Sequence, residues 1–226
     1  IRQADKLQAM QIKHGVDDSG VWESLESLSG EQRQVIRKNG KVTTVFPERH
    51  LVTISHDKKS SPFHPQLPKN RELLKQFYNV TLAGQGRVAN KDAQILRVMP
   101  KDKYRYGYKF WLEKDTGLLL KCDLMDERGK IVEQLMFSEL IILPESPETN
   151  LLLEKAKQYR VVDLDQGREI QKKTHWQAKY LPKGFMLTRS NIKPGKQGKG
   201  LVQHIIYSDG MASVSVFVEQ NKPEEM

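Results

Sequence analysis

The sequence predicts a mainly β protein of the α+β class, with a large, curved antiparallel sheet that forms an unclosed barrel and a smaller β-rich domain after it. Three observations predict this fold. Short runs alternate between apolar and polar residues, turn signals separate these runs, and one segment shows clear helical spacing. Because one helix is too little to cover a sheet of this size, we expect its concave face to be partly open.

The stretch from Tyr104 to Leu140 shows the clearest β pattern. Turn signals at 114–117 and 126–129 divide it into three runs, since Asp bonds to its own backbone there and Gly tolerates positive φ. Period-two alternation predicts one common apolar face for this meander. That face carries Tyr104, Tyr106, Tyr108, Phe110 and Leu112 from the first run, Leu118, Leu120, Cys122 and Leu124 from the second, and Leu135 and Phe137 from the third. The opposite face is not fully polar, so we expect both to be covered.

The residues before this stretch are predicted to form further strands of the same sheet. Asn39-Gly40, between two β runs, is a strong hairpin signal because both residues accept positive φ. Prolines interrupt the stretch 56–68, and residues 70–78 have helical spacing with Asn70 as a cap. Strands are predicted at 1–13, 21–28, 32–37, 41–46, 51–55, 80–88 and 95–99.

Two prolines, Pro144 and Pro147, end this β pattern and indicate a domain boundary. We therefore assign residues 1–143 to an N-terminal domain, residues 144–160 to a linker and residues 161–226 to a small C-terminal domain. In the small domain, strands are predicted at 161–164, 174–179, 186–190, 202–207 and 212–218. No helical pattern is evident that would cover this second sheet.

The composition restricts the kind of partner. The 226 residues carry a net charge of +9 at pH 7, and a basic surface favours nucleic acid, lipid phosphate or an acidic protein segment. The single cysteine, Cys122, excludes an internal disulfide, and no apolar run approaches the roughly 18 residues that span a bilayer. Because the sequence begins at Ile1 without a signal-like segment, we expect a mature product or a fragment.

No residue pattern indicates catalysis or a metal. None of the histidines pairs with another histidine, a cysteine or an acid at ligand spacing. They are His14, His50, His56, His64, His175 and His204. Cys122 lies on an apolar strand face, where cysteine usually acts as a small hydrophobe. We therefore predict a protein that is not an enzyme and binds neither a cofactor nor a metal.

Two kinds of binding site stay open. Tyrosines interleaved with Lys101, Lys103 and Arg105 are typical of a platform for single-stranded nucleic acid, but a half-buried strand has the same pattern, and we favour the strand. The curved sheet is also expected to hold an apolar cavity for lipid, unless the helix at 70–78 and further elements fill it. From the alternation of faces, the cavity residues are Trp22, Leu25, Tyr106, Tyr108, Phe110, Leu120, Leu135 and Phe137.

Two blocks of residues, in the same order along the chain, resemble the RseB/MucB family. The first consists of Arg105-Tyr106-Gly107-Tyr108, Asp115-Thr116-Gly117-Leu118, Leu120-Lys121, Asp123-Leu124, Gly129, Glu133-Gln134 and Phe137. The second consists of Trp176, Leu181-Pro182-Lys183-Gly184-Phe185, Leu187-Thr188, Tyr207-Ser208-Asp209-Gly210 and Ser213-Val214-Ser215-Val216-Phe217. The resemblance extends from about Val35 to Glu219.

The resemblance implies a periplasmic regulator of the sigma-E envelope-stress response. Its N-terminal domain is expected to be similar to the lipoprotein carriers LolA and LolB. Members of the family bind the periplasmic part of a membrane anti-sigma factor, RseA or MucA, and protect it from site-1 proteolysis until lipopolysaccharide or mislocalised lipoprotein releases them. The family begins before Ile1 and continues beyond Met226, so we expect both domains to be truncated here.

On this basis we expect no cofactor, a periplasmic location and no nucleic-acid partner, with self-association left open. We expect the hairpin from Tyr207 to Phe217 to help hold the anti-sigma factor, with Tyr207, Asp209 and Phe217 as its contacts. Two alternatives are kept: a lipoprotein carrier of the LolA type, which the second domain argues against, and a nucleic-acid-binding module.

Overall fold

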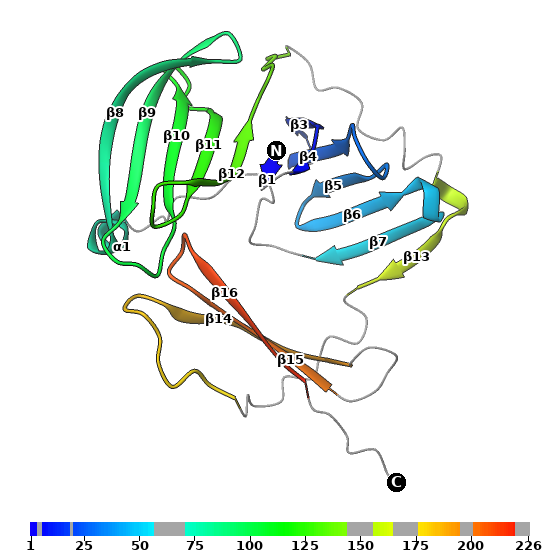
Figure 1. Cartoon of the computed structure of the whole chain (residues 1–226). Helices are drawn as coiled ribbons and strands as arrows, with labels where there is room; N and C mark the ends of the chain where they lie inside the picture. The colour runs from blue at the N-terminus through cyan, green and yellow to red at the C-terminus, as the bar shows by residue number, and fades with distance from the viewer. Residues whose placement is uncertain are drawn as a thin grey trace. The chain divides into compact units, whose positions relative to one another are not determined.

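The computed structural model describes residues 1–3, 6–18, 20–56, 71–143, 156–164, 176–194 and 201–219. Its strands form three sheets (Figure 1), so the prediction of a mainly β chain with unclosed sheets is confirmed. The expectation that the strands before Tyr104 share one sheet with the meander is corrected, because the strands between residues 10 and 56 pair in a separate sheet. The chain divides into two compact units. The first unit comprises Ile1–Pro62, Thr81–Val98 and Gly107–Gln166, and the second comprises Phe63–Val80, Met99–Tyr106 and Gly167–Met226. The domain limits drawn from the sequence stay a prediction.

The largest sheet has seven strands in the order β2-β1-β12-β11-β10-β9-β8. Their bounds are Arg2–Gln3 for β1, Lys6–Leu7 for β2, Tyr78–Val88 for β8, Lys91–Pro100 for β9, Gly107–Glu113 for β10, Leu119–Met125 for β11 and Ile131–Met136 for β12. The last three form the predicted meander, with antiparallel pairing throughout. Its first strand begins only at Gly107, so Tyr104 and Tyr106, expected on the apolar face, lie outside it and are each 50% exposed.

One face of the meander carries the rings of Tyr108 and Phe110, which stack with their centroids 5.6 Å apart. Phe110 lies opposite Cys122 on β11, and Cys122 lies opposite Leu135 on β12. These neighbours agree with the predicted face. Burial and the adjacent charges of Asp123 and Glu133 raise the pKa of the Cys122 thiol to about 12.

Leu120 departs from the predicted face because of a β-bulge. The register between β10 and β11 shifts after the pair Trp111–Lys121, so that Leu112 pairs with Leu119 and Leu120 has no partner of its own. A bulged residue no longer follows the period-two alternation of its strand. Leu120 accordingly packs in a cluster with Trp111 and Ile95 instead of joining Phe110. Its assignment to the face of Phe110 is therefore corrected.

The second sheet has six strands in the order β13-β7-β6-β5-β4-β3. Their bounds are Met10–Asp17 for β3, Gly20–Ser27 for β4, Gln34–Lys38 for β5, Lys41–Phe46 for β6, Leu51–His56 for β7 and Arg160–Asp163 for β13. Between β5 and β6, Asn39 and Gly40 both have positive φ, as the hairpin signal predicts. The short 3-10 helix η1 spans Pro47–Arg49 before β7.

β13 differs from the sequence-based expectation, which placed a strand at 161–164 in the small domain. It pairs in parallel with β7, from Arg160 opposite Leu51 to Asp163 opposite Ile54. The preceding 3-10 helix η2, Ala156–Gln158, buries Ala156 in a cluster with Val45 and Val52. This packing holds β13 on the edge of the first unit's sheet, a long-range pairing that local sequence does not encode.

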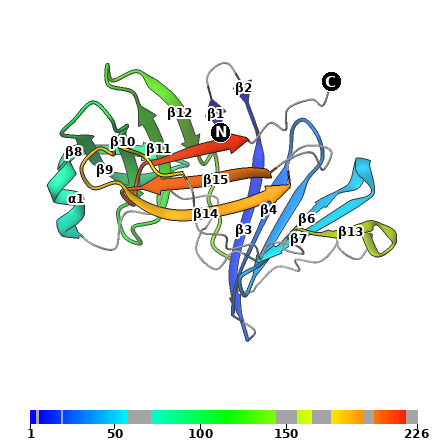
Figure 2. The same ribbon diagram turned by 90° about the horizontal axis from the view of Figure 1, so that it is seen from below.

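The second unit contains the helix α1, Arg71–Phe77, and a three-stranded antiparallel sheet in the order β14-β15-β16. These strands, Met186–Pro194, Leu201–Ser208 and Ser213–Glu219, lie side by side in Figure 2. The predicted helix at 70–78 is confirmed as α1, although its proposed cap, Asn70, lies outside the described residues. The predicted strand at 174–179 is wrong for its described part, because the Ala178 N–H donates to the Tyr207 hydroxyl, 3.0 Å away, and not to a neighbouring strand.

Gly15 is required where β3 crosses the ring of Trp22. The two residues lie opposite each other, and Trp22 is almost fully buried. A Cβ atom on residue 15 would lie 2.5 Å from the Cζ2 atom and 2.7 Å from the Cε2 atom of the indole. Such distances lie far inside van der Waals contact, and a close-packed core cannot move a large ring freely.

We expect the substitution Gly15→Ala to lower the free energy of unfolding by about 1–3 kcal/mol, the usual cost of overpacking. Urea denaturation monitored by tryptophan fluorescence measures the loss. Val16→Ala is the control, because Val16 is the next residue of the strand and is 68% exposed. Equal losses for the two variants would contradict the proposed close contact.

We expect the Cys122 thiol to react about a thousandfold more slowly at pH 8 than a thiol with the ordinary pKa of 9.0, because its pKa of about 12 leaves so little thiolate. The rate with a chromogenic disulfide measures this. The same protein in urea serves as control, since Cys122 is the only cysteine. A native thiol that reacts as fast as the unfolded one would show that burial does not protect it.

Candidate functional site

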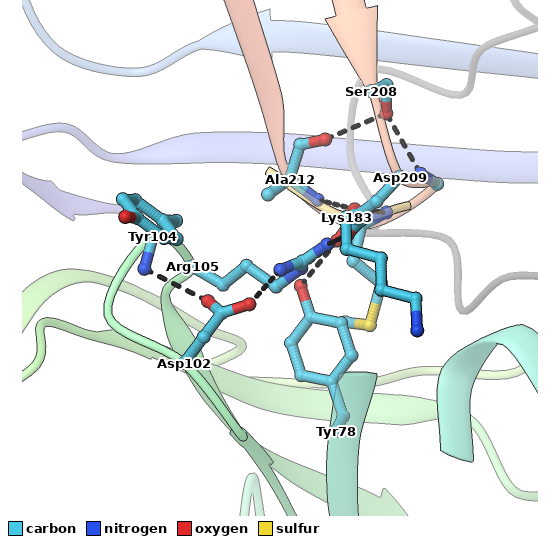
Figure 3. Close-up of polar contacts among 10 residues, drawn as sticks. Tyr78, Asp102, Tyr104, Arg105, Lys183, Ser208, Asp209 and Ala212 are labelled. Atoms are coloured by element: carbon cyan, nitrogen blue, oxygen red, sulfur yellow. Dashed lines mark hydrogen bonds and ion pairs between the residues drawn. The ribbon is translucent and has the colours of Figure 1, made fainter. Parts of the chain in front are cut away.

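A buried arginine organises the second unit (Figure 3). The side chain of Arg105 is fully buried, and its Nε donates to the Oδ2 atom of Asp209 at 2.5 Å. Its Nη1 donates to the carboxylate of Asp102, and its Nη2 donates to the backbone carbonyl of Lys183. All three nitrogens of the guanidinium therefore have acceptors, which a buried arginine requires.

Two aromatic rings lie against the same guanidinium. Its central carbon lies 4.6 Å from the ring centroid of Phe77, at the end of α1, and 4.9 Å from that of Phe185. Gly184 allows this approach: its φ is +92°, and a Cβ atom there would lie 2.4 Å from the Phe77 ring. The rings supply cation–π attraction, which grows stronger as a site loses water.

Asp209 shapes a turn and binds the arginine at the same time. Its Oδ1 atom accepts from the backbone N–H groups of Met211 and Ala212, at 2.9 and 2.7 Å, in the turn between β15 and β16. Its Oδ2 atom accepts from Arg105 and from the Tyr78 hydroxyl, the latter at 3.2 Å. Both carboxylate oxygens are thus used, and little capacity is left for an external ligand.

We call this group of Arg105, Asp102, Asp209, Phe77 and Phe185 the Arg105 cluster. It joins the turn around residues 99–106 to the turn between β15 and β16, which are about a hundred residues apart in the chain. It contains no nucleophile with an adjacent base, and the described residues hold no group of three or more His, Cys, Asp or Glu arranged to bind a metal. Its geometry positions the neighbouring residues.

The predicted partner contacts do not share one surface. Tyr207 and Asp209 are buried, Tyr207 in a core with Phe185 and Ile205. Phe217 on β16 is 63% exposed, and its ring stacks on His204 with centroids 4.1 Å apart. Of the three, Phe217 alone offers a large surface to a partner; the roles of all three stay predictions.

The predicted cavity residues lie in two different sheets. Tyr108, Phe110 and Leu135 share one face of the seven-stranded sheet, whereas Leu120 lies with Trp111. Trp22 and Leu25 are buried and lie on opposite faces of β4. Phe137 is partly buried and follows β12, and Tyr106 is half exposed. The structure therefore brings three of the eight together, and their role in lipid binding stays a prediction.

The sequence analysis did not predict a buried role for Arg105, which it considered only as one of the basic residues that alternate with tyrosines. The alternation of tyrosines and basic residues is the same for a surface strand and for a turn with one inward arginine. The nearby Asp102 alone does not distinguish Arg105 from Lys103, because the other two acceptors of Arg105, Asp209 and the carbonyl of Lys183, come from remote parts of the chain. The signal that could have found it is the second block of residues, where Asp209 sits in a Ser-Asp-Gly turn.

Both domains of the chain match models of known families. The model of the MucB/RseB N-terminal domain matches residues 1–175, and that of the MucB/RseB C-terminal domain matches residues 170–226. The chain belongs to the MucB/RseB family. The resemblance drawn from the two residue blocks is thereby confirmed.

Two relatives of this chain are named as regulatory proteins of sigma factors. The chain is 32% identical over 210 residues to the sigma factor AlgU regulatory protein MucB of Pseudomonas aeruginosa, covering 92% of the chain and 64% of that protein. It is 24% identical over 212 residues to the sigma-E factor regulatory protein RseB of Haemophilus influenzae, covering 94% of the chain and 66% of that protein. The chain therefore spans about two thirds of the length of these relatives.

Solved structures of the family agree with this fold. The complex of Pseudomonas aeruginosa MucA and MucB aligns with a TM-score of 0.71 and 28% identity, covering 96% of this chain and 71% of that chain. A crystal structure of MucB aligns with a TM-score of 0.62 and 30% identity, covering 96% of this chain and 70% of that chain. Among the described residues of this family member, no helix has the length and hydropathy to cross a membrane.

We expect Arg105→Met to lower the free energy of unfolding by about 3–5 kcal/mol, because it leaves the buried Asp209 carboxylate without its cation. The matched control is Arg49→Met. Arg49 binds Glu31 at the same distance of 2.5 Å but is 61% exposed, so its loss is expected to cost at most about 1 kcal/mol. Urea unfolding of both variants gives the comparison, and similar losses would contradict the central place of the Arg105 cluster.

Proposed function

We propose that this chain is a regulator without catalytic activity, which binds the periplasmic part of a membrane anti-sigma factor of the MucA/RseA type. It protects that segment from site-1 proteolysis and so restrains the sigma-E envelope-stress response. The observation that carries the proposal is membership of the MucB/RseB family through both domain models, together with the likeness to MucB solved in complex with MucA. The proposal includes a periplasmic location.

We further propose that a lipid releases the complex, either lipopolysaccharide or the acyl chains of a mislocalised lipoprotein. Three of the predicted cavity residues, Tyr108, Phe110 and Leu135, lie on one face of the sheet, with Cys122 between Phe110 and Leu135, and this apolar row supports the proposal. A continuous apolar face of this kind suits an acyl chain. The net charge of +9 suits the anionic groups that such lipids carry.

A protection assay tests both statements. The full chain is mixed with the periplasmic segment of its cognate anti-sigma factor and the site-1 protease, and cleavage is followed over time with and without lipopolysaccharide. We expect the chain to slow cleavage and lipopolysaccharide to restore it, because binding shields the cleavage site. The substitution Phe110→Ser is expected to weaken the effect of the lipid while leaving protection in place, if the variant remains folded by circular dichroism.

Two results would change the proposal. Cleavage that proceeds at the same rate with and without the chain would contradict the proposed regulatory function. If the chain then still took up acylated lipoprotein, the function would become that of a lipoprotein carrier, the alternative drawn from the sequence. If the chain protects the segment but lipid does not restore cleavage, the proposed regulatory function stands and lipid is excluded as the releasing signal.

A further inference from the structure

Two exposed tyrosines flank the buried Arg105 in the chain, and a third lies against one of them. Tyr104 and Tyr106, its two neighbours in the chain, are each 50% exposed, and Tyr180 is 70% exposed. All three belong to the second unit. Tyrosine is a large, partly apolar residue whose exposure in a group is unusual unless it serves contact with another molecule. Because their rings are in contact, we call Tyr104 and Tyr180 the tyrosine patch.

The patch is held in place and not merely exposed. The rings of Tyr104 and Tyr180 meet edge to face, with centroids 6.5 Å apart and planes at 62°. A hydrogen bond with the Tyr104 hydroxyl raises the pKa of Tyr180 above its ordinary value. The backbone N–H of Tyr104 donates to Asp102 at 3.0 Å, and Asp102 also binds the buried Arg105. The Arg105 cluster therefore fixes the chain that carries Tyr104.

The charge beside the patch is positive. The ammonium of Lys103 lies 5.8 Å from the centre of the Tyr104 ring, and Lys179 and Lys183 are exposed next to Tyr180 and to Gly184. Within the described part of the chain, none of these three lysines forms a salt bridge with a carboxylate. The nearby Asp102 is already paired with Arg105. An incoming acidic group would meet uncompensated positive charge.

Resting on the proposed function, we propose that the tyrosine patch is a docking surface for the anti-sigma factor. It would bind a segment of the periplasmic part that combines apolar side chains with Asp or Glu. The apolar side chains pack on the rings of Tyr104 and Tyr180, and the acidic ones approach Lys103 and Lys183. A protein segment fits better than nucleic acid, because the two tyrosine rings meet edge to face and present no parallel faces on which bases could stack.

Because the tyrosines are ordered before binding, a few residues can supply much of the binding free energy. Tyrosines that are already ordered lose little conformational entropy on binding, and such residues often dominate the affinity of an interface. The arrangement also explains why the predicted contacts Tyr207 and Asp209 are buried. They lie beneath the turns that carry the patch, where Asp209 binds Arg105 and the Tyr207 hydroxyl accepts from Ala178, two residues before Tyr180.

Titration calorimetry of the full chain with the periplasmic segment of its cognate anti-sigma factor tests the proposal. We expect the double variant Tyr104→Ser/Tyr180→Ser to raise Kd about 30-fold or more, as for a loss of central contact residues. Tyr104→Phe is expected to stay close to wild type, because the ring remains. Lys103→Glu is expected to weaken binding, and more so at low salt than at high salt.

Two controls keep the test specific. Leu82→Ser, at a residue on β8 that is 72% exposed, and Val16→Ser, at a residue on β3 that is 68% exposed, remove similarly exposed apolar side chains outside the patch. We expect neither to change Kd by more than about twofold. Unchanged circular dichroism and thermal melting of the double variant would show that the loss of binding does not arise from unfolding.

The outcomes separate the two proposals. If the wild-type chain does not bind the segment, the proposed function and the docking surface both fail. If the wild type binds and the double variant binds equally well, or if the controls weaken binding as much, the docking surface alone is overturned. Loss of binding to a single-stranded oligonucleotide at the same salt, with peptide binding intact, would assign the patch to nucleic acid and likewise overturn the proposal.

Discussion

The burial of the Arg105 guanidinium is the constraint on which the second unit depends. Removing an arginine from water costs several kcal/mol unless its charge is paired and its N–H groups are all bonded. Asp209, Asp102 and the carbonyl of Lys183 meet that demand from three separate segments of the chain. Because each acceptor is needed, these segments are held in one arrangement, and the rings of Phe77 and Phe185 exclude water from it.

This constraint determines which side chains remain outside. With Arg105 turned inward, its neighbours Tyr104 and Tyr106 are left half exposed, and the contact between Tyr104 and Tyr180 extends the exposed aromatic surface. A surface built on a buried ion pair is rigid without requiring a regular strand or helix beneath it. The second unit thus combines a satisfied polar interior with an ordered tyrosine exterior, and ordered side chains lose little entropy when a partner binds.

The parts of the fold that depend on local sequence could be predicted, and those that depend on remote partners could not. The meander, the Asn39-Gly40 hairpin and the helix before Tyr78 follow from alternation, turn chemistry and helical spacing. The inward Arg105 and the parallel pairing of β13 with β7 need acceptors or strands far away in the chain. The assignment of Leu120 to the face of Phe110 was wrong for a third reason. A bulge interrupts the alternation of the strand without a glycine or proline to mark it.

The same chain segments serve both proposed sites, which bears on how lipid and partner could be coupled. β8 begins in the second unit, where Tyr78 donates to Asp209, and continues in the first, where Gly86 approaches the Trp111 ring. β9 returns from the first unit to the turn that carries Tyr104. A ligand that favours one arrangement of the seven-stranded sheet therefore has a continuous covalent route to the Arg105 cluster. Coupling between two sites on one protein is reciprocal, so a lipid that weakens partner binding is itself bound more weakly by the complex, typically by about 1–3 kcal/mol.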